Sequence, residues 1–368
     1  MTQADALNAD IPRLYSRWAE SFLGGPIPPE TLATCHACAM VKPPGSAPIQ
    51  NGLFFDPELV CCTFFPSLPN FLVGNILADK NRRESPVHSM VRRPLDAEGL
   101  VTPLGIYAPQ KYMLIYSHDK LGFGNDSSLR CPYLEKRGFG DSPGCSIWPH
   151  RQSVCTSWFC KFVRGSVGRK FWREMLNLLS CVENCLTWWC ILQLNFPDTA
   201  LKRLTTFDAD HGVETEMKNG RLGRELEPRD FDALWGPWEG RRSSFYKAAG
   251  RLVAGLKWTD IERIGGIEIA VPLRLVQDAY RKLTSDEIPD RLRVGNLRVL
   301  AMGPENSLLA GYVTTHPLEV PNKLLRVLKY FDGRSTDEAV AAIASNEKIR
   351  LSRGLIGKLV DHAILEQA

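Results

Sequence analysis

The chain has 368 residues, of which 44% are apolar and 23% are charged. This balance is typical of folded proteins and excludes long disordered tracts, and the length allows two or three domains with cores of their own. Lysine and arginine (45) barely outnumber aspartate and glutamate (41), so the charge does not point to nucleic acid.

The start of the chain, residues 1–10, is polar and acidic and lacks the features of a secretory signal. The most apolar stretch, 186–196, is too short to cross a bilayer. We therefore expect a cytoplasmic protein that makes no membrane contact. In that reducing compartment, eleven cysteines are more typical of metal binding or redox chemistry than of disulfides.

The first predicted element is an amphipathic helix within residues 11–34, which ends in a Gly-Gly-Pro-Ile-Pro-Pro break. From Cys35 to Cys160 the sequence is interrupted by glycine and proline, and only one strand is predicted, at Lys111–Ser117. Little regular structure is therefore expected there, and bound metal would supply the missing order.

Helices dominate the sequence that follows. Apolar residues recur every three or four positions over 166–195, and shorter helices are predicted at Ser243–Leu256 and Leu273–Leu283. Two strands, Arg291–Ala301 and Leu308–Thr315, are predicted to form a hairpin. Three short helices should end the chain: Asn322–Phe331, Thr336–Ala344 with Ser335 as its N-cap, and Ser352–Val360.

Together these elements predict an α+β fold, in which a loop-rich cysteine-cluster domain with packed helices precedes a small winged-helix-like domain. We place the cysteine-rich part at residues 1–195, a mixed helical middle segment at 196–288, and the winged-helix-like module at 289–368. The middle segment carries no chemical signature.

The strongest chemical signal is a set of eight cysteines between residues 35 and 160. Two thiolates separated by two residues can bind one metal centre, and a later pair can complete a four-thiolate site. Four more cysteines follow within thirty residues, which makes chance an unlikely cause. The predicted metal ligands are Cys35, Cys38, Cys61, Cys62, Cys131, Cys145, Cys155 and Cys160.

The order of these cysteines resembles the YkgJ family of zinc- or iron-chelating proteins. Besides the eight cysteines, the matching residues are Leu134, Ile147, Trp148 and Arg151. The resemblance implies that all eight cysteines bind metal. Arg151 fits a cofactor-binding role in which it donates hydrogen bonds to thiolates or cluster sulfide; an ordinary surface salt bridge is its alternative.

Two departures from the family pattern bear on ligation. Twenty-two residues separate Cys38 from Cys61, where the family has two or three, and Pro149-His150-Arg151 replaces the usual Arg-Pro. The insertion leaves open whether the cysteines form one centre or two. Flagellin lysine-N-methylases carry a related cysteine pattern and are regarded as iron–sulfur proteins, which makes a modifying enzyme conceivable without establishing that activity.

Thiolate-only ligand sets suit both iron–sulfur clusters and zinc. We favour an iron–sulfur cluster, of the 4Fe-4S type, with zinc as the alternative. His36 and His150 stand beside cysteines and are either ligands or ordinary packed or exposed residues. Three further cysteines, Cys181, Cys185 and Cys190, fall on the following helix, where core packing is favoured over a second metal site.

The C-terminal sequence from Leu324 to Thr336, with its Phe331-Asp332-Gly333 centre, resembles a PqqD-like winged-helix domain. That resemblance implies a peptide held along the hairpin edge by strand addition and presented to a modifying enzyme. The alternative is a packing or dimerisation domain. The basic residues of the last helices are too few for a typical DNA-reading helix.

Three functions are consistent with these patterns. The favoured one is an iron–sulfur protein that performs redox or modification chemistry on a peptide or protein substrate. The others are a non-catalytic zinc-stabilised scaffold and a metal-responsive DNA-binding regulator. Whether the chain is an enzyme is left open by the sequence.

Overall fold

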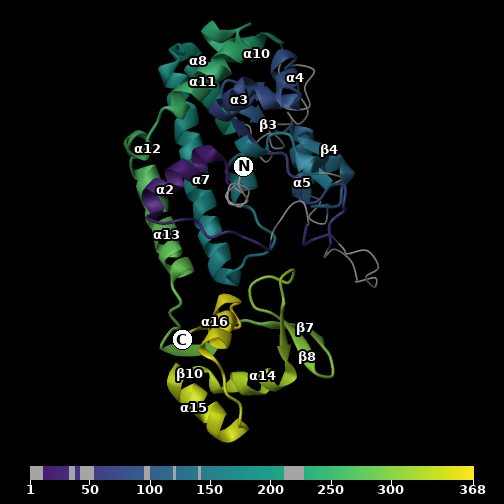
Figure 1. The fold of residues 1–368 in the computed structure, drawn as a ribbon. Coiled ribbons are helices and arrows are strands. Elements are labelled where there is room, and N and C mark those ends of the chain that lie inside the picture. The colour runs from purple at the N-terminus through teal and green to yellow at the C-terminus, as the bar shows by residue number, and fades with distance from the viewer. Residues whose placement is uncertain are drawn as a thin grey trace. The chain divides into compact units, whose positions relative to one another are not determined.

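The computed structural model describes residues 11–32, 38–41, 54–94, 100–118, 122–139, 142–210 and 228–368 (Figure 1). Helices predominate, and the strands form small antiparallel sheets. The chain divides into two compact units. The first comprises Met1–Pro29, Cys35–Trp158 and Leu176–Leu273, and the second comprises Glu30–Thr34, Phe159–Met175 and Arg274–Ala368.

The chain up to residue 284 contains eleven described helices and five short strands. The helices are α2 (Arg13–Leu23), α3 (Asn70–Ala78), α4 (Pro86–Arg92), α5 (Gln110–His118), α6 (Ser153–Ser157), α7 (Gly165–Gln193), α8 (Asp198–Asp210), α10 (Pro228–Trp235), α11 (Arg242–Ala254), α12 (Trp258–Gly265) and α13 (Ile267–Thr284). The strands β1 (Leu68–Pro69), β3 (Gly105–Tyr107) and β2 (Leu100–Thr102) form one sheet, and β4 (Leu134–Phe139) pairs with β5 (Ser142–Cys145).

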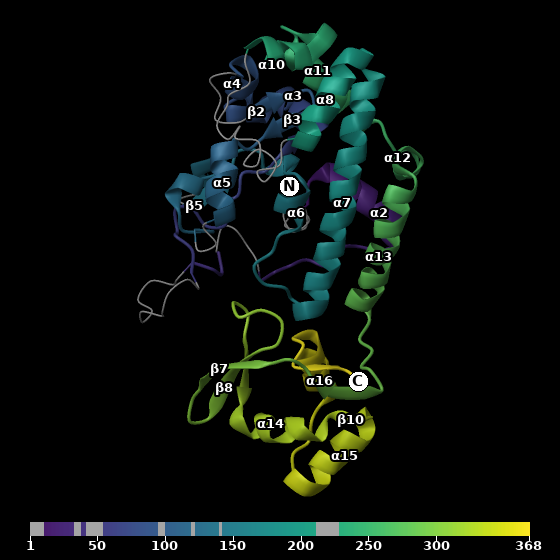
Figure 2. The ribbon, with the colours of Figure 1, turned by 180° about the vertical axis from the view of Figure 1, so that it is seen from behind.

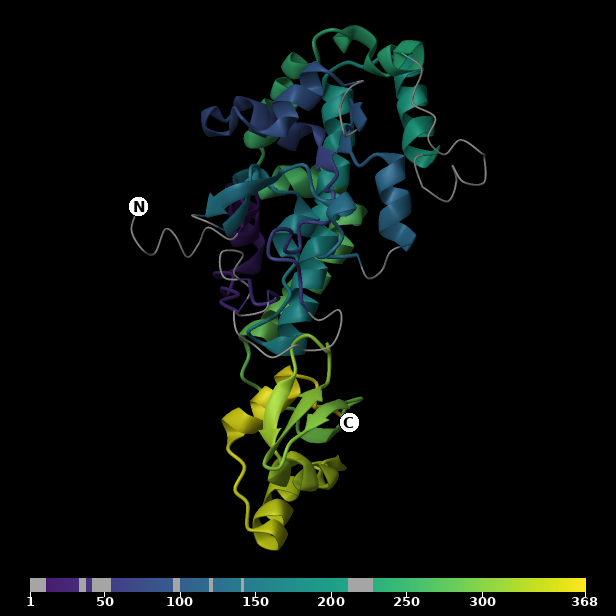
Figure 3. The same ribbon diagram turned by 90° about the vertical axis from the view of Figure 1, so that its right-hand side faces the viewer.

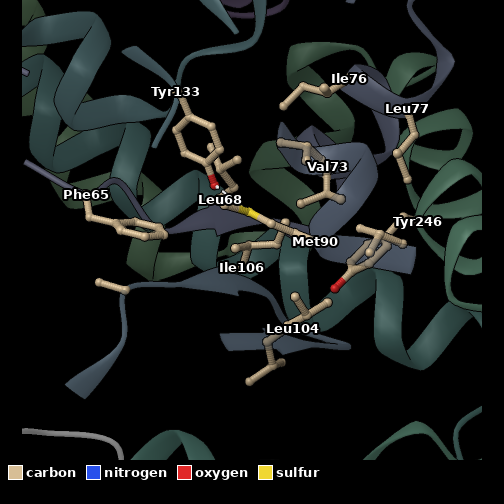
Figure 4. Packing of buried hydrophobic residues seen from close by; sticks show 14 of the residues in the cluster. Phe65, Leu68, Val73, Ile76, Leu77, Met90, Leu104, Ile106, Tyr133 and Tyr246 are labelled. Carbon is tan, nitrogen blue, oxygen red and sulfur yellow. Dashed lines mark hydrogen bonds between the residues drawn. The ribbon is translucent and has the colours of Figure 1, made fainter. Parts of the chain in front are cut away.

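The core of the first unit is built around the contact between α3 and α11. These helices approach closely because glycines face each other: a Cβ atom at Gly74 would lie 1.9 Å from the carbonyl oxygen of Tyr246, and one at Gly250 would lie 2.8 Å from the Asn75 side chain. The Tyr246 hydroxyl donates to the carbonyl oxygen of Thr102 at 2.5 Å. Figure 4 shows Val73 of α3 in this core beside β-strand and loop side chains.

This core also includes the middle segment of the sequence. Phe196, Phe231, Trp235 and Phe245 are buried in the same cluster as side chains from the cysteine-rich region. The described parts of 196–246 therefore pack with the cysteine region, although the chain between them and Cys160 is long.

The prediction of a strand at Lys111–Ser117 is wrong, because these residues lie in α5. Tyr112 and Tyr116, one helical turn apart, stack with ring centres 6.0 Å apart. The Tyr112 hydroxyl also accepts the N–H of Phe65 at 2.7 Å and donates to the carbonyl of Thr63 at 2.6 Å. These tertiary contacts outweigh the strand preference of aromatic and branched residues.

The cysteine-rich region is also more regular than the sequence predicted. It contains α3, α4, α5 and α6 as well as β1 to β5. Its fold therefore has a substantial apolar core. The first predicted helix is shorter than 11–34: α2 ends where Gly24 adopts a left-handed conformation (φ 71°), which glycine tolerates without strain.

The long helix expected at 166–195 is confirmed as α7. Among the described residues, α7 is the one helix long and apolar enough to span a bilayer, and half of its apolar window is buried inside the protein. Buried core helices pass the same test of length and composition, so the observation is weak evidence for a membrane span. The helices predicted at Ser243–Leu256 and Leu273–Leu283 correspond to α11 and to the second half of α13.

The C-terminal part of the second unit contains two small sheets and three helices (Figures 2 and 3). One sheet has the order β10 (Asp332–Ser335), β6 (Arg291–Val294), β11 (Leu365–Gln367), and the other β7 (Arg298–Met302), β8 (Asn306–Ala310), β9 (Leu318–Pro321). The helices are α14 (Asn322–Val327), α15 (Thr336–Glu347) and α16 (Arg353–Asp361). Their buried residues form a separate core around Leu292, Leu309, Val327, Phe331 and Leu359.

The predicted hairpin and three helices are present in this region, with one change. The first predicted strand, Arg291–Ala301, is divided into β6 and β7, which belong to different sheets. The division falls at Gly295, whose position leaves no room for a side chain: a Cβ atom there would lie 2.5 Å from the carbonyl oxygen of Ala363. Ser335 caps α15 as predicted, in a reciprocal pair of hydrogen bonds with Glu338.

Candidate metal centre

Five of the predicted ligands lie in the first unit within electrostatic reach of one another. We call them the thiol cluster: Cys61, Cys62, Cys131, Cys145 and Cys155. They come from four separate segments, and any non-adjacent pair is ten to ninety-four positions apart in the sequence. They are therefore brought together by the tertiary fold and not by their spacing in the sequence.

The backbone fixes the first four of these cysteines. Cys61 and Cys62 close a turn in which the N–H of Cys62 donates to the carbonyl of Leu59 at 2.9 Å. The carbonyl of Cys62 in turn accepts the N–H of Cys131 at 2.8 Å. Cys145 stands in β5 opposite Leu134 of β4, so the hairpin brings it back to the cysteine that precedes β4.

The fifth cysteine, Cys155, lies on the short helix α6, which Glu183 of α7 holds in place. The N–H and the hydroxyl of Ser153 donate to the two carboxyl oxygens of Glu183 at 2.7 and 2.6 Å. The Tyr15 hydroxyl donates to the same carboxyl group. Burial raises the pKa of Glu183 to about 7, although these hydrogen bonds oppose the rise. We infer that Glu183 is a positioning residue for Cys155.

The environment of the cluster disfavours free thiolates. A hydrogen bond to Cys62, together with burial, raises the pKa of Cys61. Burial and the neighbouring Cys145 raise the pKa of both Cys131 and Cys155. For Cys62, the hydrogen bond from Cys61 lowers the pKa, but burial and the other thiols outweigh it. Several thiolates can coexist here only when a cation balances their charge.

Arg151 supplies a positive charge to the thiol cluster. It is 6% exposed, which excludes the surface salt bridge considered from the sequence. Its guanidinium carbon lies 3.3 Å from the ring centre of Trp148, and its charge lowers the pKa of Cys61 and of Cys155. A fixed guanidinium at this place stabilises negative charge on the thiol cluster.

The thiol cluster as defined does not include the remaining three predicted ligands. Cys35 falls outside the described residues, and Cys160 belongs to the second unit. Cys38 is half-buried in the short described segment 38–41. The insertion after it is closed at its base, because the N–H of Phe55 donates to the carbonyl of Met40 at 2.8 Å. The segment that carries Cys38 is therefore hydrogen-bonded to the segment that leads into Cys61.

The two candidate histidines and the three later cysteines have other surroundings. His36 is outside the described residues, and His150 pairs with Asp79 at 2.9 Å. Cys190 is buried beside the carbonyl of Ala249, as the core prediction required. Cys181 and Cys185 are half-buried, and Cys185 donates to Glu268 at 3.5 Å.

A small cavity of about 170 Å³ is lined in part by Glu183. Its wall combines hydroxyl, amide and carboxyl groups with aromatic and aliphatic side chains. The lining residues are Ser67, Leu68, Pro69, Leu104, Tyr107, Ser180, Glu183, Asn184, Thr187 and Trp188. The volume suits a side chain or a very small molecule better than a ligand of cofactor size.

The donor set fits a thiophilic metal group. Soft sulfur ligands, burial, and one buried guanidinium are the conditions under which zinc or an iron–sulfur cluster is bound. In the part of the chain that the structure describes, no three His, Cys, Asp or Glu side chains are arranged to hold one metal ion.

Comparison with known proteins adds no relative. No protein-family model matches the chain, and no curated protein or solved structure shows significant similarity to it.

Proposed function

We propose that this chain is an iron–sulfur protein that performs redox or modification chemistry on a peptide or protein substrate. The observation that carries the proposal is the thiol cluster: five cysteines, Cys131 buried and the other four half-buried, gathered from distant segments beside a buried guanidinium. In the thiolate form that metal binding needs, the five groups repel one another, so the cluster favours a positively charged metal centre. When bound, an iron–sulfur group would supply one-electron chemistry.

The residues of this chain have separable roles in that proposal. The five cysteines hold the cluster, which we propose to be of the 4Fe-4S type, and Arg151 stabilises its negative charge. Glu183 orients α6 and with it Cys155. The resemblance of the cysteine order to the YkgJ family supports metal binding. Because exposed thiols oxidise in other compartments, we also propose a cytoplasmic location.

The substrate part of the proposal rests on strand β7. It forms one edge of its sheet, and all five of its residues are exposed. Three of them are large and apolar: Val299 (47% exposed), Leu300 (42%) and Met302 (72%). Exposed edge strands with apolar side chains favour the addition of an extended peptide, which gains backbone hydrogen bonds and side-chain contacts.

The metal is tested by purifying the full chain without oxygen. We expect a brown protein with broad absorbance near ~400 nm and with iron and acid-labile sulfide in matching amounts. Colourless protein that contains one zinc ion per chain would refute the iron–sulfur proposal and would favour the zinc-stabilised scaffold.

The peptide site is tested by a charge on β7. We expect Met302→Glu to weaken the capture of unstructured peptides from a random library by roughly tenfold, since a carboxylate would be placed in an apolar contact. Its melting temperature should stay within error of the wild type because Met302 is exposed. Asn346→Glu, at an exposed position of α15, is the matched control. Equal peptide capture by all three proteins would contradict the role of β7.

A further inference from the structure

A second group of potential metal ligands lies in the second unit. Its ligand atoms are imidazole nitrogens, whereas those of the thiol cluster are sulfurs. His316 and Tyr312 stand in the loop between β8 and β9, and His362 follows α16 directly. The loop reaches His362 because Gly311 has no side chain: a Cβ atom there would lie 2.3 Å from the carbonyl oxygen of His362. Two imidazoles separated by forty-five residues are thereby brought together.

The geometry of the two rings matches a shared ion. The ring centres of His316 and His362 lie 5.0 Å apart, at an interplanar angle of 62°. With metal–nitrogen bonds of about 2.0–2.1 Å and a tetrahedral angle, two imidazoles on one ion have ring centres about 5 Å apart. The spacing of the ring centres therefore fits one shared ion.

Two further observations point to a missing ligand. His362 is 6% exposed, and its Nδ1 atom is buried without a hydrogen-bond partner among the described residues. A buried nitrogen of this kind needs a water molecule or an ion as its partner. His316, by contrast, shares its Nδ1 with the hydroxyl of Tyr312, which leaves Nε2 as its ligating atom and fixes the ring, as second-shell groups do.

The charges nearby select the kind of ion. Lys161 and Lys358 face His316, and Lys358 and Asp361 face His362. Burial lowers the pKa of His316 to about 4 and also lowers that of His362, so both rings are neutral and able to bind metal at neutral pH. The lysines disfavour hard cations held by charge alone. Imidazole nitrogen favours zinc, nickel, copper or iron.

We propose that His316 and His362 bind a divalent transition-metal ion of the zinc type, with Tyr312 orienting His316. This site differs in ligand chemistry from the thiol cluster, and the proposal does not depend on the cluster's identity. The remaining coordination positions are open to solvent or to a donor atom of a bound molecule.

The test is ¹¹³Cd NMR of the reduced full chain after loading with Cd²⁺, since thiolate-rich and nitrogen-rich sites resonate in separate regions. We expect one nitrogen-type resonance in the wild type, lost in both His316→Gln and His362→Gln while any thiolate-type resonances remain. His118→Gln, at an exposed histidine of α5, is the control and should keep all resonances. Tyr312→Phe should keep the nitrogen-type resonance but weaken Zn²⁺ binding to that site by about 10–100-fold.

The proposal is overturned when the wild type shows no nitrogen-type resonance, because a water molecule then satisfies Nδ1 of His362. It is also overturned when that resonance persists in His316→Gln. His316 is only half-buried, so this variant tests the site even when His362→Gln fails to fold.

Discussion

The thiol cluster of the first unit and the imidazole pair of the second, the two metal sites that we propose, differ in the protonation state of their groups. The thiol cluster collects groups that must lose protons, and burial with mutual repulsion keeps their pKa values high. The imidazole pair is already neutral, because burial lowers the pKa of both rings. Binding at the first site must therefore release protons, whereas binding at the second need not.

The difference also appears in what surrounds each site. A buried guanidinium, Arg151, faces the cysteines and compensates negative charge. Two ammonium groups, Lys161 and Lys358, face His316 and act against any cation. The first site is thus suited to a metal group that carries a net negative charge together with its thiolate ligands. The second is suited to an ion bound mainly through covalent affinity for nitrogen.

The largest expected effect would separate the two sites directly. Cys61→Ser and Cys155→Ser should each reduce thiolate-bound metal by roughly tenfold or more, because the cluster loses one of its ligands. The apolar core around α3 and α11 should keep the fold, so the far-ultraviolet circular dichroism should change little. Elemental analysis of the purified chains measures the loss.

Cys181→Ser is the control for these variants, since Cys181 is half-exposed on α7 and outside the thiol cluster. Unchanged metal content in both Cys61→Ser and Cys155→Ser would break the comparison, because the cysteines would then not be ligands.

A smaller effect is expected from the support of the cluster. Glu183→Ala removes the acceptor for Tyr15 and for two groups of Ser153. Buried donors left without partners cost about 1–3 kcal/mol each, so we expect a loss of about 3 kcal/mol in the free energy of unfolding. Urea unfolding followed by tryptophan fluorescence measures it.

Asn184→Ala, at the exposed neighbouring position of α7, should change stability by less than about 0.5 kcal/mol. If Glu183→Ala proved as stable as Asn184→Ala, contacts other than those of Glu183 would hold α6 in place.

The smallest effect concerns pH and lies in the second unit. Glu30 is buried and accepts the N–H of Val163 at 2.6 Å and that of the Trp172 indole at 2.9 Å. Burial raises the pKa of Glu30 above its ordinary 4.5. The folded state therefore binds the proton of the Glu30 carboxyl group more tightly than the unfolded state does. The resulting stability is complete below pH 4.5 and is lost as the pH rises through the raised pKa.

We expect the wild type to lose about 1 kcal/mol more than Glu30→Gln between pH 4 and pH 8. Thermal unfolding at the two pH values measures the difference. Glu287→Gln, at an exposed glutamate of the same unit, should follow the wild type at both. Parallel pH profiles for wild type and Glu30→Gln would show that Glu30 does not titrate differently in the folded state.

Much of this fold was predictable from periodic patterns. The helices at 165–193 and 242–254 and the cap at Ser335 were confirmed, because apolar spacing and capping residues are local signals. The strand predicted at Lys111–Ser117 failed because the contacts of the Tyr112 hydroxyl are tertiary, and no local pattern encodes them.

The candidate sites also differ in how much of them local sequence could predict. The cysteines were visible because their number and order are unusual in any chain. Glu183 was not, since a single acid within an apolar helix has no spacing that reveals its partners. The pairing of His316 with His362 could not be predicted either, because it depends on the close approach of Gly311 to the end of α16.

The open edge of β7 has a consequence for handling the protein. Its outer backbone groups and the side chains of Val299, Leu300 and Met302 are as accessible to the same strand of another copy as to a peptide. Two chains can meet there edge to edge, with Arg298 as the one charge on the strand to oppose them. Concentrated samples should accordingly scatter light increasingly with time, and a saturating peptide ligand should act as their stabiliser in storage.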